Sequence, residues 1–176
     1  MQYEGFVVTQ QPFVDTNLMR SQVVYADKDT AVEIARGRPT GQHISKVSID
    51  ITNPFITDKS DPFVDIGKIK PYVSREQFQQ IAQGNPVELT ETNEWERIQE
   101  RHPGLGLMEV FHEFPDEFDK LPMWAEQLYN STTVHDMLVM NNFDGAIHAV
   151  HGPYPGAVAY HTFHPARITF IEKVSL

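Results

Sequence analysis

The sequence of 176 residues contains no cysteine, which removes disulfide scaffolds, thiolate zinc sites and cysteine nucleophiles together. It also lacks an uninterrupted apolar run of the roughly eighteen residues that a membrane-spanning helix needs. Residues 1–5 have neither a basic flank nor an apolar stretch of signal-peptide length. We therefore expect a cytoplasmic protein with no membrane partner, in which a metal site would have to use the eight histidines.

Positive charge is scarce, because 14 lysine and arginine residues face 24 aspartate and glutamate residues and leave a net charge of -10. The resulting field repels phosphate backbones, which weakens a nucleic-acid-binding prediction without excluding a small basic groove. No glycine-rich phosphate loop or dinucleotide fingerprint stands between a predicted strand and a helix. A bound nucleotide would have to be held in another way.

Strand patterns gather near the two ends of the chain. β-Branched and aromatic runs bounded by turn residues predict strands at 5–9, 22–26, 43–51, 145–150, 157–163 and 168–171. Pro54 is expected to stop the third of these strands, because proline cannot donate to a ladder.

Helical patterns lie mainly between these groups of strands. Residues 29–37 predict a helix in which Thr30 and Glu33 form a capping box and Gly37 supplies a left-handed end. Ser74 and Gln77 have capping-box spacing as well. They predict a helix to residue 82, closed at residue 84. A helix at 90–101 follows, and then helices between 105 and 142 with breaks at 115 and 122, the last of them at 133–140. We predict an α+β fold and a single domain spanning residues 1–176.

Three segments of the sequence have counterparts, in the same order, in one family. Residues 23–27 (VVYAD), a helix from Thr30 and a strand ending in NPF at 53–55 resemble that family's Y-F-A/S strand, short helix and Asn-Pro-Leu/Phe strand end. Residues 142–147 (NFDGAI) resemble its G-Y-D-G-I motif, and residues 159–168 (AYHTFHPARI) its terminal E-Y-V-V-F-D-P-S-Q-I segment. The family is the ADP-ribosyltransferases, in particular their phage and polymorphic-toxin branch. The resemblance implies a split β-sheet core with helices between the strand groups.

The resemblance also implies that NAD, the donor of ADP-ribose, binds in a cleft between two half-sheets and loses nicotinamide on transfer. Contacts at the end of the first strand hold the nicotinamide amide in the family, and here Thr9 and Gln10 stand near that position. Tyr25 is the candidate for the aromatic residue of the cleft, and His161 for a further ligand contact. A solvated strand end and a core tyrosine are the structural alternatives.

The candidate catalytic positions are Ala159 and Tyr25. Alignment on the terminal motif puts Ala159 where the family has a glutamate, which offsets the positive charge that develops on the ribose. Ala157 stands where arginine-modifying relatives have their first glutamate. Three explanations stay open: a deliberate Glu-to-Ala change that silences a toxic enzyme, which we favour, a natural non-catalytic binder, or a shifted register.

Residues 152–156 (GPYPG) directly precede this strand, at the place where transferases have their acceptor-recognition loop. Tyr154 is therefore the candidate substrate-binding residue, although a plain hairpin turn is equally compatible. The expected function is that of a toxin or phage effector with a macromolecular acceptor, protein or nucleic acid, and with an antitoxin or inhibitor protein as a further partner. The alternative is a catalytically empty nucleotide- or protein-binding module on the same fold.

No metal site is expected. The late histidines at 148, 151, 161 and 164 have no spacing that resembles a metal-binding helix.

Overall fold

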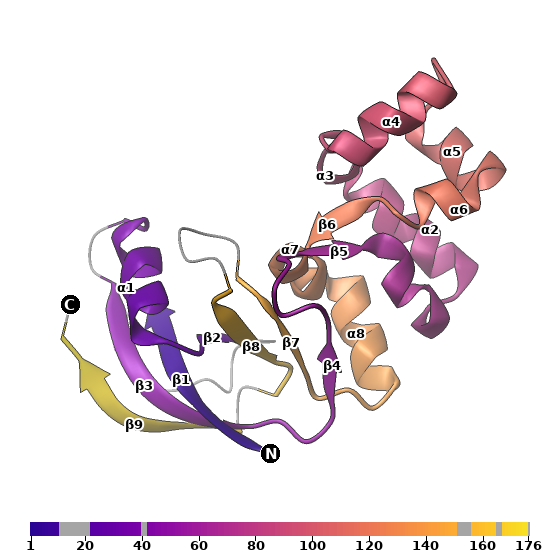
Figure 1. The fold of residues 1–176 in the computed structure, drawn as a ribbon. Helices are drawn as coiled ribbons and strands as arrows, with labels where there is room; N and C mark the ends of the chain where they lie inside the picture. The colour runs from indigo at the N-terminus through magenta and orange to yellow at the C-terminus, as the bar shows by residue number, and fades with distance from the viewer. Residues whose placement is uncertain (11–21, 40–41, 151–155, 165–166, 176) are drawn as a thin grey trace. The chain divides into compact units, whose positions relative to one another are not determined.

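The structure of the protein is a computed structural model that describes residues 1–10, 22–39, 42–150, 156–164 and 167–175 (Figure 1). The chain divides into two compact units. Unit 1 contains Met1–Pro62 and Leu138–Leu176 and is built from both ends of the sequence, whereas unit 2 is Phe63–Met137. Most of the strand residues lie in unit 1 and most of the helices in unit 2, which confirms the prediction of an α+β fold. One domain over residues 1–176 stays a prediction.

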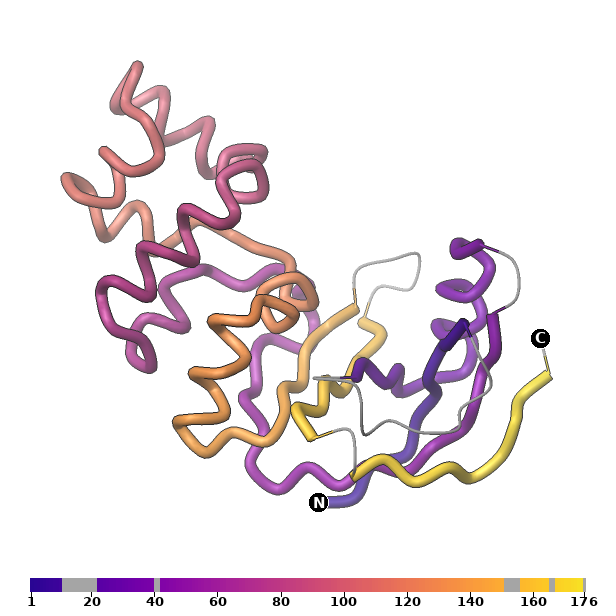
Figure 2. Tube along the Cα trace, turned by 180° about the vertical axis from the view of Figure 1, so that it is seen from behind, coloured from indigo at the N-terminus to yellow at the C-terminus, as the bar shows by residue number. Residues whose placement is uncertain are grey.

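Unit 1 contains a seven-stranded sheet with the strand order β4-β7-β8-β2-β1-β3-β9. Neighbouring strands are antiparallel, except that β4 and β7 are parallel. Figure 2 shows β9 at the edge of the sheet beside β3. All six predicted strands are confirmed. The strands are β1 Gln2–Thr9, β2 Gln22–Tyr25, β3 His43–Asp50, β4 Pro54–Ile56, β7 Gly145–Ala149, β8 Val158–Thr162 and β9 Ile168–Val174.

The sheet consists of two halves that meet at β1 and β2. β1 pairs with β3 along its whole length, from Gln2 to Thr9. Between β1 and β2, in contrast, the register pair of the described residues is Phe6 with Tyr25. Gly5 stands next to this pair, and a Cβ atom there would lie 2.5 Å from the Tyr25 carbonyl oxygen, so the approach of β2 requires glycine. We call this place the junction. It joins a β4-β7-β8-β2 half to a β1-β3-β9 half.

Helix α1 (Lys28–Arg36) follows β2, and its ends differ from the prediction. Asp27 is the N-cap, since its carboxylate accepts a hydrogen bond from the Thr30 backbone N–H at 2.8 Å and another from the Thr30 hydroxyl. The capping box of Thr30 and Glu33 is therefore wrong, because an acceptor three residues earlier already caps the helix. Gly37 has φ -74°, so the predicted left-handed end is wrong as well.

Each face of the sheet has its own apolar cluster. Ala31 and Ala35 of α1 pack on one face. The buried members of this cluster are Val8, Tyr25, Ala31, Ala35, Ile44, Val150 and Ala159. On the other face the buried members are Val7, Val24, Val47, Ile49, Ile51 and Ile168. The alternation of neighbouring residues between the two clusters is the period of two expected for strands buried on both faces.

Strand β4 begins at Pro54, which was predicted to end the strand before it. The stop itself is confirmed, since β3 ends at Asp50. The chain then re-enters the sheet as a strand at its edge, parallel to β7. A first residue on an edge strand is one of the few strand positions that proline tolerates.

Asp144, at the start of β7, ties the turn after β3 to the segment before β9. Its carboxylate accepts hydrogen bonds from the backbone N–H groups of Thr52 and Asn53, both at 2.8 Å, and lies 2.6 Å from the Arg167 guanidinium. The Asn53 side chain donates to the Asn142 carbonyl oxygen at 3.0 Å. Asp144 is 7% exposed, so these contacts replace the water that its charge would otherwise need.

Burial alone would raise the pKa of Asp144. The two backbone donors and the charge of Arg167 outweigh that effect and hold the pKa of this carboxyl below its ordinary value. The contribution of Asp144 to folding is therefore present above the pKa of the unfolded chain and is lost as the pH falls through the lower, folded value.

Unit 2 consists of short helices and one two-stranded antiparallel sheet of β5 and β6. Neither strand was predicted, because each has three residues and β6 begins with a proline. In sequence order the elements are β5 Phe63–Asp65, the 3-10 helix η1 Ile66–Tyr72, α2 Arg75–Gly84, α3 Pro86–Thr90, α4 Asn93–Arg101, α5 Leu107–Glu113, α6 Pro115–Phe118, β6 Pro122–Trp124 and α7 Ala125–Asn130. Helix α8 Thr132–Met140 then leads into unit 1.

The helix starts of unit 2 agree with the capping signals at one place and differ at another. The capping box of Ser74 and Gln77 is confirmed, with both reciprocal hydrogen bonds present. The helix predicted from residue 90 begins at Asn93 instead, because the Thr92 side chain caps it.

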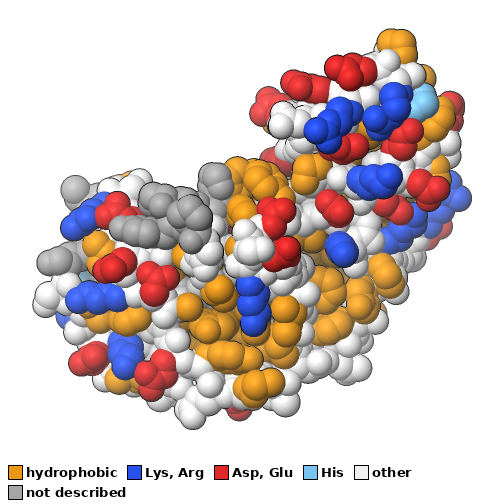
Figure 3. Space-filling model, in the orientation of Figure 1, with side chains coloured by type: hydrophobic (Ala, Val, Ile, Leu, Met, Phe, Trp, Pro, Cys, Tyr) orange, Lys and Arg blue, Asp and Glu red, His pale blue; other side chains and the backbone are white. Residues whose placement is uncertain are grey.

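On the face of unit 2 seen in Figure 3, acidic and basic side chains are mixed. Within the described part of the chain, no helix combines the length and the apolar character needed to cross a bilayer.

We expect Asp144→Asn to lower the free energy of unfolding by about 2 to 4 kcal/mol at pH 7, because an amide loses the ion pair and one backbone acceptor of a buried charge. Urea unfolding measures this change. The gap between the two proteins should narrow as the pH falls below about 4, where the unfolded carboxyl is protonated.

Asp50→Asn is the matched control, because the Asp50 side chain is 61% exposed and its ion pair with the N-terminus spans 3.4 Å. A change within about 0.5 kcal/mol is expected there. Equal effects of the two substitutions would contradict the role given to Asp144.

Candidate functional site

The junction brings two of the predicted site residues into direct register. Tyr25 pairs with Phe6 on one side and with Ala159 on the other, and Ala159 pairs in turn with His148. Cross-strand partners point to the same face of a sheet. A row of four side chains, Phe6, Tyr25, Ala159 and His148, therefore crosses from one half-sheet to the other.

This row is closed to solvent at its centre. Tyr25 is 2% exposed and Ala159 is 0% exposed, and both belong to the cluster under α1. The small side chains Ala31 and Ala35 form the helix side of that cluster. Tyr25 is thus placed as a core residue of its strand, and its contact with NAD stays a prediction.

His161 lies two residues after Ala159 on β8 and is also fully buried. It pairs with Val23 and with Ala146, so it shares the face of Ala159, as alternation predicted. Its ring centroid lies 6.3 Å from that of His148. The structure therefore gathers Tyr25, Ala159, His148 and His161 on one face of three adjacent strands.

His148 is held in its neutral form. Burial lowers its pKa, and the hydrogen bond that its Nδ1 donates to the Ala149 carbonyl oxygen at 2.9 Å only partly opposes this effect. A neutral imidazole beside position 159 can donate or accept a hydrogen bond but brings no charge to the junction.

The remaining predicted residues lie elsewhere. Thr9 is the last residue of β1, where it pairs with His43 and is partly exposed, and Gln10 follows it in an exposed position. Both belong to the β1-β3-β9 half, beyond the pair that forms the junction. Tyr154 lies outside the described residues, so its role as a substrate contact stays a prediction.

An aromatic pair that sequence reasoning missed spans the junction on the opposite face. The rings of Tyr3 and Tyr160 lie with their centroids 4.6 Å apart and are tilted by 31°. Both are partly buried against the second cluster. Burial, with a smaller effect of Tyr3, raises the pKa of Tyr160, so its phenol stays protonated near neutral pH. Alternation from Ala159 could have placed Tyr160 on this face, but nothing in the sequence pairs it with Tyr3.

Two motif residues have structural explanations of their own. A Cβ atom at position 145 would lie 2.7 Å from the His161 carbonyl oxygen, so Gly145 lets β7 and β8 approach. Asn142 has φ 66°, a left-handed conformation that asparagine tolerates better than most residues. The Asp-Gly motif of residues 142–147 therefore holds the sheet together, whatever ligand the junction takes.

In the described part of the chain, no group of three or more His, Asp or Glu side chains is arranged to hold a metal ion. A cavity of about 400 Å³ is lined by residues of unit 2, and none of the predicted site residues lines it.

Comparison with known proteins adds no relative, because no protein-family model, no curated protein and no solved structure matches this chain.

We expect Ala159→Glu to destabilise the protein in a pH-dependent way. The introduced carboxylate would be buried beside Tyr25, so its folded pKa would rise above the unfolded value, and the destabilisation would appear as the pH rises above that unfolded value. At pH 8 the free energy of unfolding should fall about 2 kcal/mol below that of Ala159→Gln, which has the same shape without the charge. The gap should close near pH 4, at about the unfolded pKa of a glutamate.

Thermal and urea unfolding of both variants at the two pH values test this expectation. If the two variants were equally stable at both pH values, the side chain at 159 would reach solvent and the buried placement would be contradicted.

Proposed function

We propose that this chain has the ADP-ribosyltransferase fold, that NAD binds at the junction of its two half-sheets, and that position 159 is where the fold has its catalytic carboxylate. In an active form the protein would be a toxin or phage effector that transfers ADP-ribose from NAD to a macromolecule and releases nicotinamide. With Ala159 in place, it would bind NAD without efficient transfer.

One observation carries this proposal. The two half-sheets are joined by the pair of Phe6 and Tyr25, and Ala159 lies directly beside Tyr25 on the next strand. The resemblance implies a ligand cleft between half-sheets, with the glutamate of the terminal motif near it. Position 159 lies one strand away from the junction. This location is compatible with the alignment to the terminal motif, in which the family's glutamate lies near the cleft.

The residues present fit binding better than catalysis. The Tyr25 ring and the polar strand end at Thr9 and Gln10 provide an aromatic and a hydrogen-bonding contact of the kinds that the resemblance implies for nicotinamide. The methyl group of Ala159 cannot offset the positive charge that grows on the ribose when the bond to nicotinamide breaks. Because Tyr25 is 2% exposed, NAD would reach its ring only after the packing under α1 opens.

A second candidate function is a catalytically empty module that binds a protein or nucleotide through the same fold. The complete burial of Ala159 among apolar residues supports it, because a core position filled by a methyl group needs no ligand. The two proposals differ in what a carboxylate at this position does. In an enzyme it would restore chemistry, and in an empty module it would only reduce stability.

The class of acceptor stays open between protein and nucleic acid. Tyr154 is proposed as the acceptor contact because its loop leads directly into the strand with position 159. An antitoxin or inhibitor protein is proposed as a partner of an active toxin.

Restoring the carboxylate gives the decisive activity test. We expect Ala159→Glu to release nicotinamide from NAD at least about 100-fold faster than Ala159→Gln, because a preplaced charge stabilises the transition state and an amide does not. Calorimetric titration should detect NAD binding by the chain as it stands. Chromatographic detection of nicotinamide and thermal unfolding, run in parallel, separate loss of chemistry from loss of fold.

If both the unchanged chain and Ala159→Glu remain folded and neither binds nor consumes NAD, the enzyme proposal fails. Folded protein that binds NAD in both forms without releasing nicotinamide would favour the empty module.

A further inference from the structure

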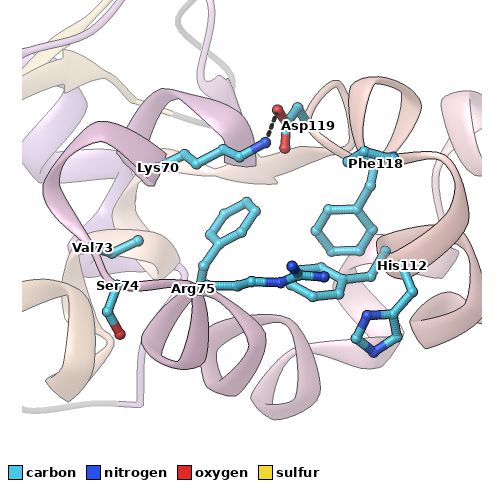
Figure 4. Close-up of a pocket in the computed structure, with 10 residues that line it drawn as sticks. Lys70, Val73, Ser74, Arg75, His112, Phe118 and Asp119 are labelled. Carbon is cyan, nitrogen blue, oxygen red and sulfur yellow. Dashed lines mark hydrogen bonds and ion pairs between the residues drawn. The ribbon is translucent and has the colours of Figure 1, made fainter.

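Unit 2 has a cavity of its own, with walls from η1, α2, α5 and α6 (Figure 4). Its volume of about 400 Å³ is enough for a small organic molecule. All its lining residues belong to Phe63–Met137, so the cavity does not depend on the junction in unit 1.

Three phenylalanines form the apolar wall of this cavity. Phe78, Phe111 and Phe118 are 3%, 6% and 0% exposed. The Phe111 and Phe118 rings meet edge to face with centroids 5.1 Å apart, and the Phe78 and Phe118 rings do so at 5.8 Å. Because so little of these rings is exposed, a flat apolar partner reaches their faces only when the packing around them opens.

The charged side chains that line the cavity carry one more positive than negative charge. The Lys70 ammonium lies 2.6 Å from Asp119, so this charge is already compensated. Arg75 lines the same cavity at the start of α2, and its charge also acts on the neighbouring Glu76 carboxylate, whose pKa it helps to lower. Figure 4 shows its side chain extending toward the side of the cavity where His112 lies.

This excess of positive charge is local, because the whole chain has a net charge of -10. A guanidinium beside an apolar wall combines two contacts that one ligand can satisfy. Its planar fork matches a carboxylate or a phosphate, and the wall matches an aromatic ring. The exposed His112 imidazole adds a second donor at the same rim.

We propose that unit 2 binds a small aromatic anion in this cavity, with the ring against Phe78, Phe111 and Phe118 and the carboxylate or phosphate on Arg75. The ligand is recognised by its charge as much as by its ring. The site is separate from the proposed NAD site, so either can fail without the other.

Binding to the full chain can be tested with three matched probes, 2-naphthoate, 2-naphthyl phosphate and the neutral 2-naphthamide. In an amide-resolved NMR titration, we expect the better anion to bind with a Kd below about 1 mM and to shift the signals of Arg75, Phe111 and His112. The neutral amide should bind at least about tenfold more weakly, because it loses the charged hydrogen bond. The tighter of the two anions identifies the headgroup.

Two charge-removing variants complete the test. Arg75→Gln should raise the Kd of the better anion by at least about tenfold. Lys68→Gln removes the same charge from an exposed position of η1 that does not line the cavity, and it should leave the Kd within about twofold.

Three results would overturn the proposal. They are no saturable shift up to about 10 mM of either anion, equal affinity for the neutral amide, or equal effects of the two variants. The comparison between anion and amide uses the unchanged chain, so it holds even if Arg75→Gln does not fold.

Discussion

The buried carboxylate of Asp144 is the constraint on which the architecture of unit 1 most depends. Three donors from two separate segments converge on it: the backbone amides of Thr52 and Asn53, which follow β3, and Arg167, which precedes β9. Because the charge is removed from water, each donor has to remain in place for the unit to stay folded. This requirement fixes where β7 enters the sheet and, through β7, where β8 and position 159 lie.

The junction has a different character from this anchor. Among the described residues one register pair joins the half-sheets, and apolar packing under α1 and the pair of Tyr3 and Tyr160 supply contacts on the two faces. Hydrogen-bonded ladders resist opening more than isolated pairs do, so the junction is where ligand entry would disturb the fewest backbone hydrogen bonds. Asp144 thus fixes one half-sheet through several hydrogen bonds, while the junction is held by fewer backbone contacts. This combination suits a ligand held between two half-sheets.

Much of the fold could be predicted because its signals are local. The strand runs are β-branched and the capping box of Ser74 and Gln77 depends on four consecutive residues, so each could be read directly. The errors have local causes as well. Asp27 displaced Thr30 as the cap of α1, and β4, β5 and β6 are too short to show a period.

The candidate site was predictable to the same extent. Alternation along β8 placed His161 on the face of Ala159, and the structure agrees. No local sequence pattern predicts that Tyr3 packs on Tyr160, because this contact depends on how the two half-sheets meet. The cavity of unit 2 was missed for the same reason, since its lining comes from elements that are separate in the sequence.

The central claim is that NAD binds at the junction, and a methyl-resolved NMR titration of the unchanged chain with NAD tests it most directly. The account predicts saturable chemical-shift changes concentrated on the methyl groups that flank the junction, which are those of Val7, Val8, Val23, Val24 and Ala159. Methyl groups of unit 2 should remain unchanged in the same titration. Saturable shifts confined to other residues, or no shifts at NAD concentrations that saturate ordinary NAD-binding proteins, would contradict the account.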